Sequence, residues 1–380
     1  MQRIHPQVDF SLELADGQDE RAHIQSFLRP FDLTQAPLLR VVLIRKSPDD
    51  HVLLFDMHHL IADGLSTVHL ANEFIALYEG KELPPLRIQV KDYTEWQNRW
   101  LSSEQAARQE RFWLAQFADG VPALQLPTDF VRPSRKTTEG ARIAAQLSER
   151  DSQAVRDLAA RYGATPYMVL LTAFYALLHK YAGQDEIVVG TPVAGRTHSD
   201  IQPLIGMFVN TLALKVKISA NESCGELLNA TKALTLEAFQ HQDYPFERLI
   251  DGLKLERDLS RNPLFDAMFI VQNMGLPELE LDEVLFAPYA LDNPTAKFDL
   301  TLEAVEHGTA LTLNLEYATS LFTPETAERM LRHYIRIVQS VCREPDCSVS
   351  ELEWMSEEEK RIILGDFNAT HRDYPEDCTL

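Results

Sequence analysis

Leu38 to Arg45 reads LLRVVLIR, and His51 to Met57 reads HVLLFDM. The residues between them, Lys46 to Asp50, read KSPDD and have the composition of a turn. Two runs of β-branched and apolar residues around a turn predict a hairpin of buried strands. The second run leads directly into His58 to Gly64, which reads HHLIADG. The sequence therefore predicts a histidine-containing polar segment at the end of a buried strand.

A helix is predicted directly after this segment, with Gly80 at its end. Asp63 and Gly64 accordingly come just before the N-terminus of that helix. The apolar residues that recur at helical spacing on one of its faces are Val68, Ala71, Phe74, Ile75 and Tyr78.

The rest of the chain alternates between strand and helix patterns. Ser148 caps a helix that ends near Gly163, and Thr165 with Pro166 begins an apolar helix. Thr323 opens the last helix that the pattern indicates. Further segments are expected as a helix at 90–100, strands at 142–147, 187–190 and 212–216, and a hairpin of 298–305 with 311–317. These elements predict a mixed α/β chain.

Composition and charge narrow the classes of partner. The chain has 380 residues, of which 36 are basic and 57 acidic, giving a net charge of −21. A surface with this much negative charge repels phosphates. We therefore expect neither nucleic acid nor an anionic membrane to bind. The longest apolar stretch, Tyr167 to Leu178, is too short to span a bilayer, and no signal-peptide pattern opens the chain. A cytoplasmic location is therefore expected. The cysteines Cys224, Cys342, Cys347 and Cys378 lack metal-site spacing, which favours reduced thiols.

Three interpretations of HHLIADG remain open from the residues alone. His59 with Asp63 could bind a metal ion, but no third ligand is near and the strand-to-loop setting argues against it. A purely structural role is the second interpretation. The third is acyl transfer, in which a histidine positions and deprotonates a nucleophile, Asp63 holds the loop and Gly64 lets the backbone approach the reacting carbonyl. Because adjacent strand residues face opposite sides, we expect only one histidine to serve the pocket and the other to be structural.

Several motifs carry a resemblance to a known family. HHLIADGLS at 58–66 resembles the active-site motif of the chloramphenicol acetyltransferase-like superfamily, in the form found in condensation domains of non-ribosomal peptide synthetases. The other motifs occur in the same order as in that family. They are KDYTEW at 91–96, IGMFVNTL at 205–212, HQDYPFE at 241–247 and RDLSRNPLF at 257–265.

The resemblance implies an α/β fold of two acetyltransferase-like lobes in a V-shaped pseudodimer. It assigns residues 1–125 to the first lobe, 126–352 to the second, and 353–380 to a linker and the start of an adenylation domain. It implies peptide-bond formation between substrates on the 4′-phosphopantetheine arms of donor and acceptor peptidyl carrier proteins. His59 and Gly64 would be catalytic, with His58, Asp63, Arg196 and Asn210 supporting the site. No metal and no cofactor of the domain's own is expected.

The two ends of the chain differ from the family pattern. Two early motifs of the family are missing, so the first lobe is expected to be incomplete at its N-terminus, and the residues near 367–375 resemble the opening of an adenylation domain. Two alternative functions stay open. One is a catalytically inactive scaffold that docks carrier proteins, and the other is a standalone acyltransferase that uses acyl-CoA.

Overall fold

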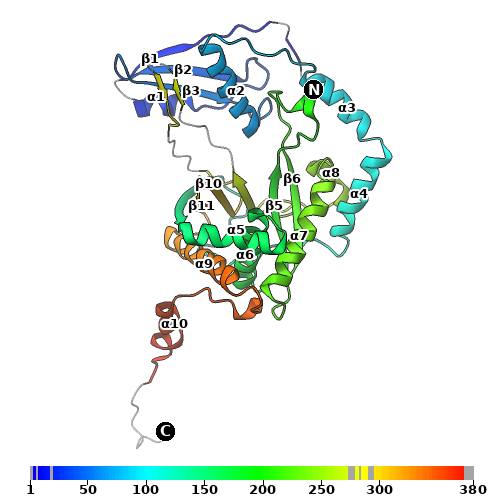
Figure 1. Cartoon of the computed structure of the whole chain (residues 1–380), viewed down its shortest axis with the longest axis vertical. Coiled ribbons are helices and arrows are strands. Elements are labelled where there is room, and N and C mark those ends of the chain that lie inside the picture. Colours follow the sequence, from blue (N-terminus) through cyan, green and yellow to red (C-terminus); the bar gives the residue numbers. More distant parts are fainter. Residues whose placement is uncertain are drawn as a thin grey trace, which may run out of the picture.

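The computed structural model describes residues 3–5, 7–17, 20–272, 279–281, 284–289 and 295–371. Figure 1 shows two bodies, a smaller one built from the first part of the chain and a larger one built from the later part. We call the body formed by Glu13–Tyr78 the first lobe, and the body from Gly140 to Glu351 the second lobe. Helices α3 (Val90–Trp100) and α4 (Glu104–Gln116) run along one side of the molecule between them.

The first lobe is a three-stranded sheet with two helices. Strand β1 (Glu13–Asp16) pairs in parallel with β2 (Leu39–Arg45), and β2 pairs antiparallel with β3 (His51–Met57). The predicted hairpin is therefore confirmed, whereas β1 and helix α1 (Glu20–Phe27) were not predicted. Six residues form its small buried core: Ile24, Phe27, Val42, Ile44, Val52 and Leu54.

Helix α2 (Gly64–Tyr78) follows β3 as predicted, with Asp63 as its N-cap. The apolar face of α2 is less buried than the helical pattern predicts. Phe74 and Tyr78 on this face are 42% and 57% exposed. Both rings contact Phe286 of strand β9 (Val284–Phe286) edge-on, at centroid distances of 6.1 and 5.7 Å. Strand β9 pairs with β8 (Leu279–Leu281). Only one residue of α2 is fully buried, and it is the polar Ser66.

The second lobe is organised around a six-stranded sheet in the order β4-β11-β10-β7-β5-β6. The strands are β4 (Gly140–Leu147), β5 (Glu186–Val193), β6 (Asn210–Lys217), β7 (Ala267–Gln272), β10 (Leu300–His307) and β11 (Ala310–Ala318). The predicted hairpin of the last two strands is confirmed by their antiparallel pairing.

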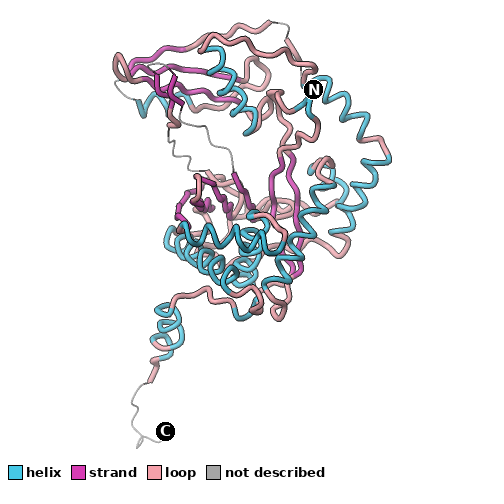
Figure 2. Tube along the Cα trace, viewed as in Figure 1, coloured by secondary structure: helices cyan, strands magenta, loops and turns pink. Residues whose placement is uncertain are grey.

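Helices cover this sheet as the tube in Figure 2 shows. They are α5 (Glu149–Tyr162), α6 (Pro166–Ala182), α7 (Cys224–Gln240) and α9 (Pro324–Arg343), with α8 (Phe246–Leu253) close to α4. The predicted caps are confirmed, since the side chains of Ser148, Thr165 and Thr323 each accept a backbone N–H at the start of α5, α6 and α9.

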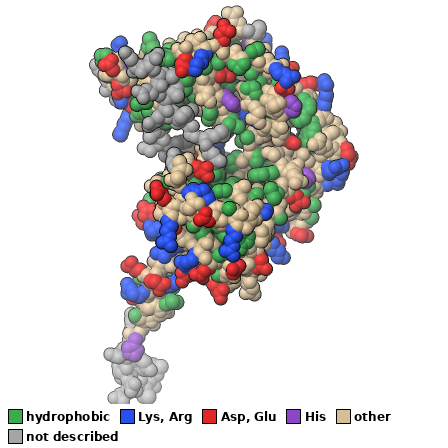
Figure 3. Space-filling model, viewed as in Figure 1, with side chains coloured by type: hydrophobic (Ala, Val, Ile, Leu, Met, Phe, Trp, Pro, Cys, Tyr) green, Lys and Arg blue, Asp and Glu red, His purple; other side chains and the backbone are tan. Residues whose placement is uncertain are grey.

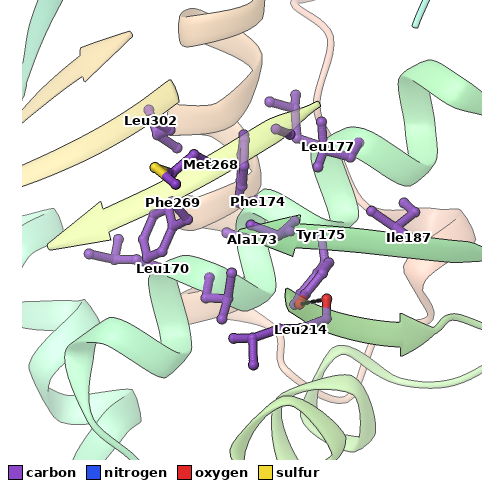
Figure 4. Packing of buried hydrophobic residues seen from close by; sticks show 14 of the residues in the cluster. Leu170, Ala173, Phe174, Tyr175, Leu177, Ile187, Leu214, Met268, Phe269 and Leu302 are labelled. Carbon is purple, nitrogen blue, oxygen red and sulfur yellow. Dashed lines mark hydrogen bonds between the residues drawn. The ribbon is translucent and has the colours of Figure 1, made fainter. Parts of the chain in front are cut away.

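Helix α6 is the centre of the core. Every residue from Met168 to Leu178 is buried, because the helix contacts β5 and β7 on one side and α5, α7 and α9 on the other. Phe174 packs against Phe269 of β7, and the Tyr175 hydroxyl donates a 2.8 Å hydrogen bond to the Leu214 carbonyl of β6 (Figure 4). Such packing of apolar side chains gives the second lobe a much larger core than the first.

The chain continues past α9 through a 3₁₀ turn at Val349–Glu351 to helix α10 (Glu357–Leu364), which projects from the second lobe in Figure 1. This helix was not predicted. Short 3₁₀ turns also occur at Ser199–Ile201 and Asp366–Asn368. Acidic and basic side chains are interspersed over the face of the larger body seen in Figure 3. Within the described part of the chain, no helix combines the length and the apolar character needed to cross a membrane.

The predicted boundary between lobes at residue 125 stays a prediction. Trp113 and Phe117, which lie before it, are buried in the large cluster of the second lobe together with Leu124. The expected start of an adenylation domain lies partly outside the described residues, as does Cys378.

Candidate active site

The two adjacent histidines lie in a turn just beyond β3, whose last residue is Met57. The His58 N–H donates to the Leu38 carbonyl at 3.0 Å, and the His58 carbonyl accepts from Ile61 N–H at 3.0 Å. Both histidines border one cavity of about 470 Å³, which is also lined by Phe31. The strand ends before the two histidines, so strand alternation alone does not determine their directions, and the expected division of roles between them stays a prediction.

The two imidazoles have different hydrogen bonds. Nδ1 of His58 accepts from the Leu60 N–H at 3.1 Å, and its ring meets Phe31 edge-on at 5.9 Å. Nδ1 of His59 lies 2.7 Å from the Ala62 carbonyl oxygen. Since a carbonyl oxygen only accepts, Nδ1 of His59 carries a proton, and in the neutral form of the ring Nε2 is therefore the acceptor. The His59 residue is exposed, so its imidazole lies where a substrate can reach it.

Asp63 is the N-cap of α2 and is buried. Its Oδ1 accepts from the Ser66 backbone N–H at 2.8 Å and from the Ser66 hydroxyl at 2.7 Å. Its Oδ2 accepts from the Phe208 N–H, at 3.0 Å, in the loop that precedes β6. These bonds satisfy the carboxylate and hold the start of α2 against the second lobe.

Arg196, in the loop after β5, provides the counter-charge of Asp63. Nη2 lies 3.0 Å from Oδ1 of Asp63 and 2.9 Å from Oγ of Ser66, and the side chain is 0% exposed. The guanidinium also lies over the Phe208 ring, at 4.3 Å from its centroid. Nη1 donates to three backbone carbonyls of the same loop, those of Ile201, Gln202 and Leu204.

The surroundings keep Asp63 ionised. Burial alone would raise the pKa of Asp63, but hydrogen bonds from Ser66 and the Phe208 amide, with the positive charge of Arg196, outweigh burial and lower that pKa. Asp63 is therefore suited to holding the loop as a permanent anion and is a poor proton carrier near neutral pH.

Gly64 is the first residue of α2 and is exposed. A Cβ built on it would meet no protein atom within 4 Å. Neither packing nor a left-handed backbone explains a glycine here, so the space beside it remains free for another molecule.

Asn210 begins β6 and organises a second loop. Its side-chain amide donates to the carbonyls of Gln242 and Tyr244, at 2.8 Å each, while its Oδ1 accepts from the Phe246 N–H at 3.1 Å. Helix α4 holds the same loop from the other side, since the Trp113 indole donates to the His241 carbonyl at 2.8 Å. Asn210 thus supports the HQDYPFE motif, and it does not contact the histidines through any hydrogen bond that the structure shows among the described residues.

Sequence reasoning missed one residue of this cluster, Ser66. Its side chain is completely buried between Asp63, Arg196 and Gly206. Its place in HHLIADGLS was the available signal, but a serine in the first turn of a helix is common enough to pass as an ordinary helix start. In the described ranges, no three His, Cys, Asp or Glu side chains come together in a way that could bind a metal ion.

The family model of the condensation domain matches residues 1–364. The chain belongs to the condensation domain family. It is 43% identical over 382 residues to tyrocidine synthase 3 of Brevibacillus parabrevis, covering 100% of this chain and 6% of that protein. It is 42% identical over 383 residues to surfactin synthase subunit 1 of Bacillus subtilis, covering 100% of this chain and 11% of that protein. This condensation domain thus spans only a small part of these relatives.

Solved structures show the same fold. A holo four-domain non-ribosomal peptide synthetase bound to AMP and glycine aligns with 93% of this chain and 29% of its own, at a TM-score of 0.82 and 23% identity. The X-domain in complex with OxyB from teicoplanin biosynthesis aligns with 93% of this chain and 82% of its own, at a TM-score of 0.83 and 25% identity. The predicted family and the acetyltransferase-like α/β fold with two sheets are confirmed, and the V-shaped pseudodimer is consistent with these structures.

Proposed function

We propose that this condensation domain forms a peptide bond between two carrier-bound substrates. The donor is an aminoacyl or peptidyl thioester, and the acceptor is the α-amine of an aminoacyl thioester, each on the 4′-phosphopantetheine arm of a peptidyl carrier protein. The observation that carries this proposal is His59, an exposed residue at the cavity whose Nδ1 is fixed by the Ala62 carbonyl, which leaves Nε2 to accept.

The proposed reaction needs only modest proton chemistry. An α-amine has a pKa near 8, so a useful fraction is neutral at physiological pH. His59 Nε2 accepts a hydrogen bond from the amine and orients its lone pair toward the donor carbonyl. The nitrogen forms the new C–N bond, the C–S bond breaks, and the proton lost from nitrogen passes through His59 to the leaving thiolate.

Gly64 and the start of α2 serve the reacting carbonyl in this proposal. The open space at Gly64 lets a thioester approach the backbone closely. The N-terminus of α2 carries a partial positive charge, which favours the oxyanion that forms during attack. Asp63 and Arg196 act in this proposal only by holding the loop that carries these groups.

The proposed assembly follows the larger relatives. Residues 1–125 and 126–352 would form the two lobes between which the substrates meet, and residues 353–380 would lead to an adenylation domain. Carrier proteins would bring the phosphopantetheine arms, so the domain needs no cofactor of its own.

The test is single-turnover transfer between a donor and an acceptor carrier protein, each loaded with a radiolabelled amino acid. His59→Ala is expected to abolish dipeptide formation and to change the free energy of unfolding by no more than about 0.5 kcal/mol, because the side chain is exposed. His51→Ala is the matched control, since His51 is an exposed histidine at the start of β3.

Full activity of His59→Ala would remove this residue from the mechanism. A wild-type domain that binds both loaded carriers without joining their substrates would favour the docking scaffold. Transfer from a soluble acyl-CoA in the absence of carriers would favour the standalone acyltransferase.

A further inference from the structure

The Ser66 hydroxyl has four polar neighbours and is completely buried. It accepts from the Gly206 N–H at 3.0 Å and from Nη2 of Arg196 at 2.9 Å. Its own proton lies within reach of Oδ1 of Asp63 at 2.7 Å and of the Gly206 carbonyl at 2.8 Å. A serine hydroxyl has one proton and two acceptor sites, so this arrangement uses its full hydrogen-bonding capacity.

These neighbours come from both lobes. Asp63 and Ser66 belong to the start of α2, whereas Arg196 and Gly206 lie in the loop between β5 and β6, up to 140 residues away in the sequence. A single hydroxyl thus binds both backbone groups of Gly206, its N–H and its carbonyl. Through these bonds, Ser66 determines how the two segments lie against each other.

Gly206 allows its loop to pack closely against α3. A Cβ at this position would lie 2.8 Å from the Phe208 ring and 2.8 Å from a Val90 methyl group. The loop is therefore packed tightly against α3 on one side while Ser66 holds it on the other. Two residues on, the Phe208 N–H donates to Asp63, and two residues after that Asn210 binds the loop at 241–246.

We propose that Ser66 is a positioning residue for condensation, which sets the histidine turn at 58–63 in register with the loop that Asn210 holds. The proposal rests on the proposed function, because it concerns where the two substrate-facing segments lie. Removing the hydroxyl leaves the Gly206 N–H and carbonyl without their partner, so the loop is free to shift relative to α2. A shift of this kind moves the loops at 205–210 and 241–246 relative to the histidine turn, so a substrate held between them is misaligned with His59.

Two measurements on the full chain test the proposal. In single-turnover transfer between loaded carrier proteins, Ser66→Ala is expected to lower the rate constant tenfold or more, while the apparent affinity for the carriers changes less than twofold. In hydrogen exchange, the amides of Gly206 and Phe208 are expected to exchange at least tenfold faster in Ser66→Ala than in the wild type.

Ser152→Ala is the matched control. Ser152 is also completely buried, and its hydroxyl accepts from the Leu311 N–H at 3.2 Å. It belongs to α5 and faces β11 in the core of the second lobe, away from the Ser66 contacts. This variant is expected to lose stability without slowing transfer or exchange at Gly206. If Ser66→Ala does not fold, Ser66→Cys carries the same measurements, because a thiol fills the site and hydrogen-bonds weakly.

The two measurements separate the possible failures. Wild-type protein that transfers nothing, with fast exchange at Gly206 in Ser66→Ala, contradicts the proposed function and retains the link through Ser66. Normal transfer by Ser66→Ala overturns the positioning role, and so does a rate lowered equally in Ser66→Ala and Ser152→Ala. Unchanged exchange at Gly206 in Ser66→Ala overturns the structural link itself.

Discussion

Nη2 of Arg196 donates a 3.0 Å hydrogen bond to Oδ1 of Asp63 across 133 residues of sequence. The two side chains are 0% and 3% exposed, so the ion pair is withdrawn from water. Taking two charges out of water is costly, and a buried pair is tolerated only where further hydrogen bonds satisfy both ions. Ser66, Phe208 and the loop carbonyls provide most of those bonds here, whereas Nε of Arg196 is buried without a hydrogen-bond partner among the described residues.

Loss of Asp63 is expected to damage both stability and activity. Asp63→Ala leaves the buried Arg196 cation without a counter-charge, which costs about 3–5 kcal/mol of the free energy of unfolding. Urea denaturation measures this loss. Asp16→Ala is the control, because its ion pair with Arg45 is exposed and is expected to contribute less than about 1 kcal/mol. Equal losses in the two variants would contradict the view that burial makes the pair important.

Gly64→Ala is expected to impair transfer without destabilising the fold. Alanine is a better helix former than glycine and meets no protein atom here, so stability should stay equal or rise by up to about 1 kcal/mol. The added methyl group occupies the space proposed for the thioester, so we expect at least a tenfold slower single turnover.

Gly183→Ala is the control for this experiment and should show the opposite pattern. Gly183 ends α6 with a φ of 63°, a backbone conformation that alanine adopts only at a cost of about 1–2 kcal/mol. This variant should therefore have a lower melting temperature than the wild type and a normal rate of transfer. A Gly64→Ala protein with normal transfer would show that the open space is not used by the substrate.

Asn210→Ala is expected to release the loop at 241–246. The change leaves the Gln242 and Tyr244 carbonyls and the Phe246 N–H without partners in a half-buried place, which costs about 1–3 kcal/mol. Faster hydrogen exchange at the Phe246 amide would report the release. The Leu249 amide, which donates to the Pro245 carbonyl within the start of α8, serves as an internal reference. Unchanged exchange at Phe246 would show that α4 holds the loop without Asn210.

Acidification is expected to weaken the attachment of α10. Nε2 of His333 lies 3.0 Å from Oε1 of Glu359, and the Tyr181 hydroxyl lies 2.7 Å from Nδ1 of His333. Burial lowers the pKa of His333 below 6.5, despite the nearby carboxylate. Burial opposes ionisation of Glu359, but the Ser356 bonds and His333 outweigh it and lower the Glu359 pKa to about 2.

The lowered pKa values of His333 and Glu359 both make the folded protein less stable as the pH falls. Below pH 6.5 the unfolded state binds the His333 proton more readily than the folded state, so stability falls as the pH drops. The stability from Glu359 is present above pH 4.5 and is lost as the pH falls toward 2. Arg329 and Arg332 on α9 also disfavour the charged form of His333.

Trp354 fluorescence measures the change, since the indole contacts the His333 ring edge-on at 4.9 Å. We expect one transition below pH 6.5 and a second below pH 4.5. Glu359→Gln should remove the second transition and keep the first. A single transition in both proteins would show that the pair does not control the attachment of α10.

Local chemistry determined much of this protein from the sequence alone. The hairpin of β2 and β3, the caps at Ser148, Thr165 and Thr323, and the position of Asp63 before α2 depend on neighbours a few residues away. Side-chain periodicity and helix caps arise from short-range packing and hydrogen bonds. A single sequence is therefore enough to predict these elements. Arg196 and Asn210 became candidate site residues through the resemblance of their motifs to the family. The spacing of residues in this sequence alone did not indicate them.

Only the tertiary structure decided which distant groups meet. The sheet order β4-β11-β10-β7-β5-β6 brings together strands that are far apart in the sequence, and the loop from β5 to β6 then reaches the start of α2. The same packing leaves Phe74 exposed at 42%, buries Ser66 at 0% and places both histidines at one cavity. No local pattern contains these outcomes, because burial and long-range hydrogen bonds depend on what the rest of the chain places alongside each residue.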